Sequence, residues 1–144
     1  MNLRHRRYFI GPYSDTPEIT MIGPPPYDVV DEPFEREQLG EAIRRAIDAF
    51  GHEKTASADL QRISEDRGLE LARLAGVRDR KTFERGARYV SFDCVGGDQI
   101  LVTPHFRKRG YWEPVPEEKW LTLFRPSDAE LGQAAITAAE RAAA

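Results

Sequence analysis

The chain has 144 residues, 40% of them hydrophobic and 31% charged, and its net charge is −3. This length predicts one domain spanning residues 1–144, able to bury roughly two-thirds of the surface that the unfolded chain exposes. The single cysteine, Cys94, excludes an internal disulfide framework, and no apolar run approaches the ~20 residues that a membrane span needs. We therefore expect a cytoplasmic protein with no membrane contact.

Charge is distributed unevenly along the chain. Residues 1–12 carry +3, residues 13–53 carry −7, residues 54–88 carry +3, residues 89–112 carry +1 and residues 113–144 carry −3. An acidic patch within 13–53 would suit a basic protein partner and disfavour nucleic acid. A solvated helix face is the commoner explanation of such a run.

Short strands are predicted near the N-terminus. Arg7–Ile10 and Ile19–Ile22 flank a loop dense in turn-forming residues. Gly23–Pro26 contains three consecutive prolines, which donate no backbone hydrogen bonds and hold an extended conformation, so it predicts a rigid spacer. Tyr27–Val30 predicts another strand.

Two amphipathic helices of similar design are predicted. Apolar residues recur every three or four positions along Glu35–Gly51, and Gly51 favours a helix end there. The sequence does not decide where between Asp31 and Arg36 this helix begins. The same pattern returns in Ser127–Ala144 after a strand at Trp120–Phe124, so that Leu39-Gly40 aligns with Leu131-Gly132; chance similarity is the alternative. Ser127 and Glu130 form a capping-box pattern at the second helix.

The middle of the chain predicts helix and then hairpin. A region from about Ser57 to Gly76 is one helix or, because Gly68 interrupts it, two short ones. Tyr89–Val95 and Gln99–Thr103 alternate in polarity around a glycine turn and predict a β-hairpin. Cys94 falls on its apolar face, which predicts a buried, unreactive thiol. Overall we expect an α+β fold of two layers, a mostly antiparallel sheet of four or five strands with the helices packed on one face.

Signals for chemistry are weak. The three histidines are isolated, the lone cysteine adds no metal pair, and the glycine turn lacks the spacing that cradles phosphate. We therefore predict no catalytic residue, no metal site and no cofactor, and thus a protein that is not an enzyme.

The stretch Arg107–Trp112 combines arginines with two aromatic residues. It supports an alternative function, a small RNA-binding or regulatory module, because arginines pair with phosphates and aromatic rings stack on bases. The flanking acids Glu113, Glu117 and Glu118 would repel a phosphate backbone. Half-buried aromatic residues at the end of a hairpin are the favoured interpretation.

The order of these motifs resembles the immunity proteins of contact-dependent growth inhibition (CDI) systems. A strand followed by a helix with Leu-Gly occurs twice. Between the copies lie an alanine-glycine step, a Lys-x-Phe element and a strand pair ending in Thr-Pro, which are Ala75-Gly76, Lys81–Phe83 and Thr103-Pro104. The resemblance covers most of residues 20–144.

The resemblance implies a non-catalytic protein that neutralises the toxic C-terminal domain of a secreted effector. Such toxins are often nucleases and hence often basic, which agrees with the acidic segment. The expected mechanism is occlusion of the toxin's active site or substrate surface. The candidate toxin-binding residues are Asp28, Asp31, Glu32 and Glu35 together with, if the sheet brings them near, Tyr111, Trp112, Glu113, Glu117 and Glu118.

Overall fold

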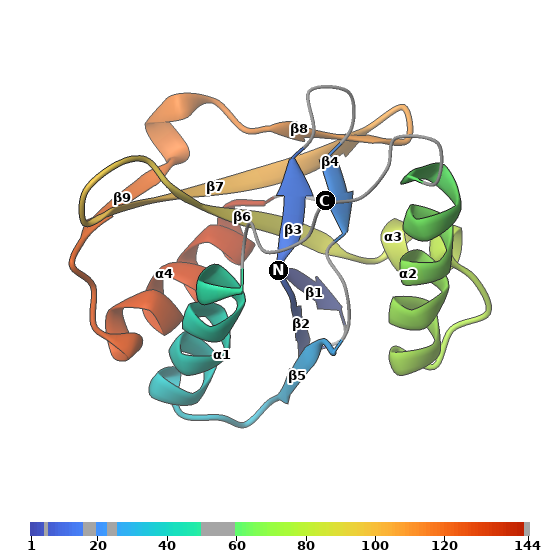
Figure 1. The fold of residues 1–144 in the computed structure, drawn as a ribbon, viewed down its shortest axis with the longest axis horizontal. Helices are drawn as coiled ribbons and strands as arrows, with labels where there is room; N and C mark the ends of the chain where they lie inside the picture. Colours follow the sequence, from blue (N-terminus) through green and yellow to red (C-terminus); the bar gives the residue numbers. More distant parts are fainter. Residues whose placement is uncertain (5, 16–19, 23–25, 50–59, 143–144) are drawn as a thin grey trace.

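Figure 1 shows the computed structural model of the chain, which describes residues 1–4, 6–15, 20–22, 26–49 and 60–142. Residues 23–25 of the predicted proline spacer Gly23–Pro26 and the predicted helix stop at Gly51 lie outside these residues.

An antiparallel sheet of seven strands forms the centre of the molecule. Its order is β5-β2-β1-β6-β7-β8, and β9 pairs with the other end of β7. A separate small sheet pairs β3 with β4. The bounds are Asn2–Arg4 (β1), Arg7–Ile10 (β2), Tyr13–Asp15 (β3), Thr20–Ile22 (β4), Asp28–Asp31 (β5), Arg88–Cys94 (β6), Gln99–Lys108 (β7), Tyr111–Pro114 (β8) and Leu121–Phe124 (β9). The α+β class is confirmed, and the main sheet has more strands than the four or five expected.

Helices cover both faces of this sheet. They are α1 (Arg36–Asp48), α2 (Leu60–Leu74), α3 (Arg80–Arg85) and α4 (Asp128–Arg141), with a short 3₁₀ helix, η2 (Glu117–Lys119). In β2, Tyr8 and Ile10 join the core under α1 and α4, whereas Phe9 packs with α2 and α3. Successive side chains of a strand point to opposite faces. The expectation that the helices pack on one face of the sheet is therefore correct for α1 and α4, while α2 and α3 lie on the opposite face.

The Leu-Gly motifs mark the point where α1 and α4 cross. A Cβ atom on Gly40 would lie 1.7 Å from the carbonyl oxygen of Asp128, and one on Gly132 would lie 2.0 Å from that of Arg36. The backbones therefore approach as closely as only glycine allows. Leu39 and Leu131, fully buried, fill the core beside the crossing, and Arg44 pairs with Asp128 at 2.6 Å.

The helix ends agree with most of the predicted signals. α1 begins after Glu35, whose N–H donates to the side chain of Gln38, and α4 has the predicted box between Ser127 and Glu130. Within the described residues, α2 is one continuous helix. Two residues after its end, Gly76 has a φ of 69°, which allows the N–H of Val77 to donate to the carbonyl of Ala72 at 2.9 Å.

The two copies of the strand–helix pattern belong to two similar halves. The first half consists of the antiparallel strands β1, β2 and β5, followed by α1. The second half consists of the antiparallel strands β6, β7 and β9, followed by α4. β1 pairs with β6 where the two halves meet. The reciprocal glycine contacts join the helices of the two halves. The halves are thus arranged about an approximate two-fold axis, with β5 and β9 at opposite ends of the sheet.

Candidate functional site

The predicted toxin-binding residues divide into two separate groups. Asp28, Asp31, Glu32 and Glu35 lie on β5 or just after it, whereas Tyr111, Trp112 and Glu113 lie on β8 and Glu117 and Glu118 on η2. Because β5 and β8 are the two ends of the strand order, the groups lie at opposite edges of the sheet (Figure 1). The sheet does not bring them together. We name them the β5 group and the β8 group.

Arginines from neighbouring elements offset the acidity of the β5 group. β2 and β5 are paired, which places the basic start of the chain against the acidic segment. The resulting ion pairs are Arg7–Asp31 at 2.6 Å, Arg45–Asp28 at 3.2 Å and Arg6–Glu32 at 3.7 Å. Three of the four acids of the β5 group are therefore paired, two of them with arginines from the basic start of the chain.

The β8 group surrounds a tight hairpin. Arg109 and Gly110 turn the chain between β7 and β8 with φ angles of 51° and 93°. Lys108 pairs with Glu113 at 3.1 Å, and Tyr111 beside the turn is 76% exposed. Glu117 and Glu118 are also exposed.

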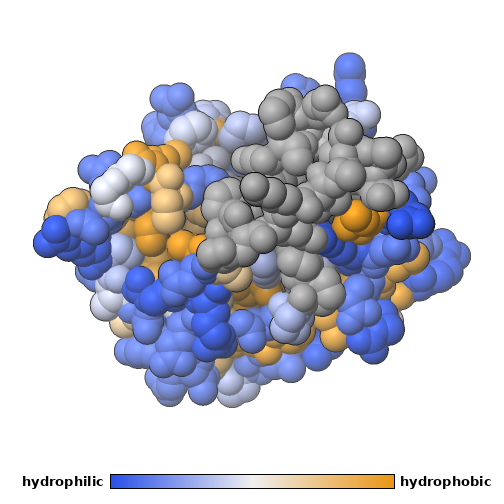
Figure 2. Space-filling model, viewed as in Figure 1, coloured by the Kyte–Doolittle hydropathy of each residue, from blue (hydrophilic) through white to orange (hydrophobic). Residues whose placement is uncertain are grey.

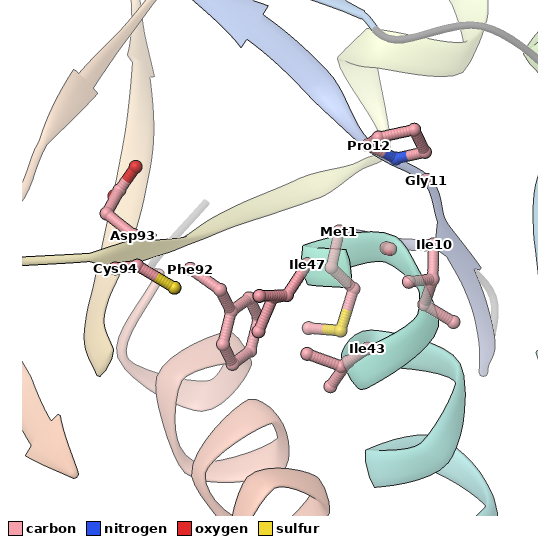
Figure 3. A pocket seen from close by; sticks show the side chains of 10 residues that line it. Met1, Ile10, Gly11, Pro12, Ile43, Ile47, Phe92, Asp93 and Cys94 are labelled. Carbon is pink, nitrogen blue, oxygen red and sulfur yellow. The ribbon is translucent and has the colours of Figure 1, made fainter. Parts of the chain in front are cut away.

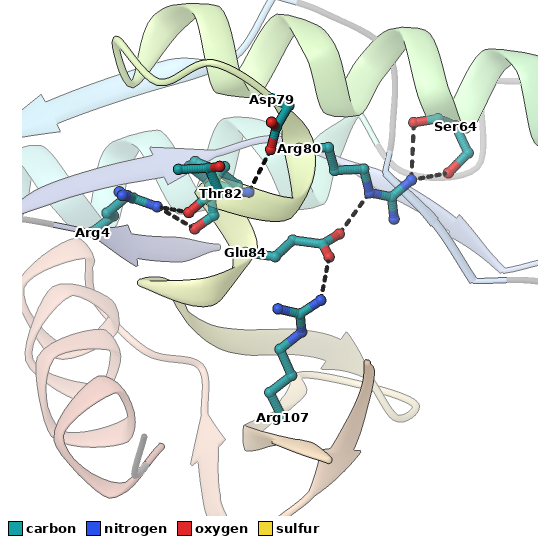
Figure 4. Close-up of polar contacts among 8 residues, drawn as sticks. Arg4, Ser64, Asp79, Arg80, Thr82, Glu84 and Arg107 are labelled. Atoms are coloured by element: carbon teal, nitrogen blue, oxygen red, sulfur yellow. Dashed lines mark hydrogen bonds and ion pairs between the residues drawn. The ribbon is translucent and has the colours of Figure 1, made fainter. Parts of the chain in front are cut away.

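Arg107, the first residue of the basic-aromatic stretch, points into the protein. It pairs with Glu84 on α3 at 3.0 Å, and Glu84 also pairs with Arg80 at 2.6 Å (Figure 4). Arg80 in turn donates to the hydroxyl of Ser64 on α2 at 3.1 Å. Glu84 thus links the second helical layer to β7, which gives Arg107 a structural role.

Arg4 joins the same layer to β1. Its guanidinium donates to the carbonyl oxygens of Thr82 and Phe83 on α3 (Figure 4). At the start of α3, hydrogen bonds from Arg78 and from Thr82 lower the pKa of Asp79 to about 2. The charges around α3 therefore serve to hold it on the sheet.

Trp112 is half-buried in a row of rings across three strands. Its ring lies 5.7 Å from that of Tyr89, and Tyr89 lies 4.7 Å from His105. Burial lowers the pKa of His105, because the charged imidazolium loses solvation. The interpretation of the hairpin aromatics as packing residues is confirmed for Trp112, while Tyr111 is left in solvent.

An apolar pocket that no sequence pattern indicated lies between α1 and the sheet. The cavity of about 280 Å³ is lined by Met1, Ile10, Gly11, Pro12, Ile43, Ala46, Ile47, Phe92, Asp93 and Cys94. In Figure 3 the side chains of Met1, Ile43, Ile47 and Phe92 point toward one another across it. Elsewhere the face drawn in Figure 2 is mainly hydrophilic, with apolar side chains in separate patches.

The prediction of a buried Cys94 is wrong. The thiol lies at the last paired position of β6, at the edge of the pocket, and is exposed. The alternation of apolar residues placed it correctly on the face toward α1. As the last paired residue of β6, Cys94 lies at the end of the sheet and not under its middle.

Comparisons with known proteins agree with the motif order. The family model described as CDI immunity protein matches residues 29–142. The chain belongs to the CDI immunity protein family. No curated protein matches the sequence.

Two solved structures share the fold of this family member. One is a Neisseria meningitidis protein described as being of unknown function, with 15% identity and a TM-score of 0.83 over 99% of this chain and 92% of the other. The second is from a toxin and immunity complex, CdiA-CT/CdiI, of Yersinia pseudotuberculosis, with 14% identity and a TM-score of 0.81 over 99% and 94%.

In this CDI immunity family member the recognised motifs are structural. Gly40 and Gly132 form the helix crossing, Gly76 ends α2, and Phe83 is buried against Phe9. The motifs therefore identify the fold and do not locate a partner. None of the helices in the described ranges combines the length and apolar character that crossing a bilayer needs.

Proposed function

We propose that this chain acts in the cytoplasm as a non-catalytic immunity protein. It binds the C-terminal toxin domain of a CDI effector, a basic nuclease, and blocks its active site or substrate surface. The observation that carries the proposal is the family match over residues 29–142. The fold shared with a structure of a toxin and immunity complex supports it further.

The two candidate groups are alternative centres for this interface. A toxin domain that covers one edge of the sheet contacts either the β5 group or the β8 group, because they lie at opposite edges. In the β5 group, exposed ion pairs such as Arg7–Asp31 contribute little to stability, because solvent screens the two charges. Cations of a basic partner can therefore replace these arginines at low cost.

The alternative of an RNA-binding module is not favoured by the geometry. Arg107 and Lys108 already pair with Glu84 and Glu113, and Trp112 packs on Tyr89. Little of the basic-aromatic stretch is left to contact phosphate and base together. Lys108, Arg109, Gly110 and Tyr111 are exposed.

Co-purification and rescue test the proposed function. The tagged chain is co-expressed with the toxin domain encoded immediately upstream of its gene, and cell growth is followed with and without it. We expect a stable complex and restored growth, whereas a toxin domain from an unrelated effector serves as the control. Failure of the folded chain both to bind and to protect would contradict the proposal.

A further inference from the structure

We infer that the free edge of β9 pairs with the same strand of a second copy of the chain, so that the main sheet continues across a two-fold axis. The inference goes beyond the proposed function and does not depend on it. It rests on the direction of the backbone groups at the edges of the sheet, on the residues found there and on the self-complementarity of β9.

The backbone groups of Thr122 and Phe124 on β9 point away from the sheet. Just after β9, the N–H of Arg125 donates to the carbonyl oxygen of Asp98 at 2.9 Å, which continues the register between β9 and β7. Hydrogen-bonded positions alternate along an antiparallel pair, so the N–H and C=O groups of Thr122 and Phe124 face outward. β9 lies at the periphery of the molecule (Figure 1), and within the described residues no strand pairs with its outer side.

The edge formed by β8 is protected against pairing with a further strand. The N–H of Val115 donates to the carbonyl oxygen of Pro104 at 3.0 Å, in the register of β7 and β8. By the same alternation, Pro114 occupies an outward position of β8. A proline has no N–H to donate, so this edge cannot complete a ladder.

The edge formed by β5 is protected by charge. The N–H of Glu32 donates to the carbonyl oxygen of Arg6 at 3.0 Å, which makes Asp31 an outward position of β5. A charged residue at the edge of a sheet disfavours the addition of a strand. β9, with the sequence Leu-Thr-Leu-Phe, has neither a charge nor a proline, and is therefore the open edge of the main sheet.

Exposed apolar side chains accompany this edge. Phe124 is 66% exposed and Val95 is 48% exposed. They lie on either side of Gln99, which is opposite Phe124 in the ladder and accepts a hydrogen bond from the N–H of Val95. Adding a strand beside β9 removes part of this apolar surface from water.

β9 is complementary to itself in one register. A two-fold axis at Leu123 places Thr122 of each copy opposite Phe124 of the other, so that their outward N–H and C=O groups meet. The two Phe124 rings then lie on one face of the sheet, on a diagonal within reach of each other. This pairing closes, whereas β9 against β5 of a second copy joins different edges and builds an open filament.

The dimer leaves the other end of each sheet free. β5 lies at the opposite end of the strand order from β9, so the β5 group stays accessible in both copies. Only two residues of each β9 offer outward backbone groups. The contact is therefore small, and small contacts between proteins are weak and transient.

Self-association of the full chain tests the inference without any partner. Sedimentation velocity from about 5 μM to about 500 μM covers the concentrations at which a small interface forms. We expect the sedimentation coefficient to rise from that of a monomer toward that of a dimer. Hydrogen exchange should slow at the higher concentrations in peptides that contain Leu121–Phe124, because their outward amides become bonded. A chain that stays monomeric throughout this range overturns the inference.

Substitutions on β9 assign the interface. Thr122→Pro removes an outward N–H and no hydrogen bond to β7, and we expect it to raise the Kd of the dimer at least about tenfold. The matched control Thr122→Val keeps the N–H and the strand propensity, so a change below about threefold is expected. Phe124→Lys adds a charge to the edge and should also dissociate the dimer, whereas Phe124→Leu should not. Circular dichroism and urea denaturation check that each variant is folded.

The outcomes separate this inference from other occupants of the edge. A dimer that persists in both Thr122→Pro and Phe124→Lys is formed by another surface, and the inference is then wrong. If the chain is monomeric and Thr122→Pro instead weakens binding of the toxin domain, the edge receives a strand of the toxin and not a second copy. The proposed function stands in either case and fails only if the folded chain neither binds the toxin nor protects the cell.

Discussion

α1 and α4 follow the same sequence design but differ in how fully they are covered. α4 is buried along its whole length, through Leu131, Ala134, Ala135, Ala138 and Ala139. In α1 the buried residues stop at Ile43, and Ala46 and Ile47 in the next turn line an open pocket.

This difference shows that an apolar stripe does not tell how closely a helix is packed. The small alanines of α4 let its backbone lie close against the sheet and the other helix. In α1 the sheet below ends near Ile10 and Cys94, and the last turn extends past the closely packed region. α4 therefore serves as scaffold, and the second half of α1 is where the fold leaves apolar surface available.

The largest effects are expected at the helix crossing. Gly40→Ala and Gly132→Ala each place a methyl group against a backbone carbonyl that cannot move aside, so we expect a loss of about 3 kcal/mol or more in the free energy of unfolding. Gly86→Ala is the control, since the added Cβ would meet only the Arg4 side chain at 3.2 Å. Urea denaturation measures all three. Equal losses for the three variants would show that the crossing is not the tight point.

A smaller effect distinguishes the covered helix from the open one. Leu131→Ala removes a fully buried side chain and should cost about 2–5 kcal/mol. Ile47→Ala removes a side chain that faces the pocket and makes fewer contacts. We therefore expect it to lower the free energy of unfolding by only about 1 kcal/mol. Chemical denaturation of both variants checks the difference, and a cost for Ile47→Ala as large as that for Leu131→Ala would contradict an open pocket.

The smallest effect concerns the helix starts. Hydrogen bonds from Ser127 lower the pKa of Glu130 below its ordinary value of 4.5. The ionised Glu130 therefore stabilises the folded protein above pH 4.5, and this stabilisation is lost as the pH falls through the lowered pKa. The equivalent residue of α1, Gln38, does not titrate. We expect Glu130→Gln to reduce the loss of stability in acid and Gln38→Glu to add to it, as measured by thermal melts between about pH 2 and pH 6. Unchanged pH dependence in both variants would refute this role of the cap.

Local patterns were sufficient for much of the fold. The spacing of apolar residues predicted α1 and α4, polarity alternation predicted the β6–β7 hairpin, and glycine chemistry predicted the end of α2 at Gly76. These features depend on neighbours a few residues apart. The short strands β1, β3 and β8 were missed because three or four residues, several of them charged, carry too little periodicity; β3 lies in the stretch that was expected to be a loop.

The site could not be predicted in the same way because it depends on long-range pairing. Nothing local tells that Arg7 will face Asp31, so the sequence suggested an acidic patch where the structure has ion pairs. Likewise, the strand order that separates the β5 group from Tyr111 is a property of the whole sheet. The exposure of Cys94 and the pocket follow from where α1 ends relative to β6.

The crossing of α1 and α4 at Gly40 and Gly132 is made by main-chain atoms. Such a joint restricts the choice of residue at two positions only and leaves the chemistry of the outer surfaces free to drift. Substitutions at the sheet edges therefore leave this joint, and with it the arrangement of the two halves, unchanged. Solved structures with only 14–15% identity share this fold at TM-scores of 0.81–0.83.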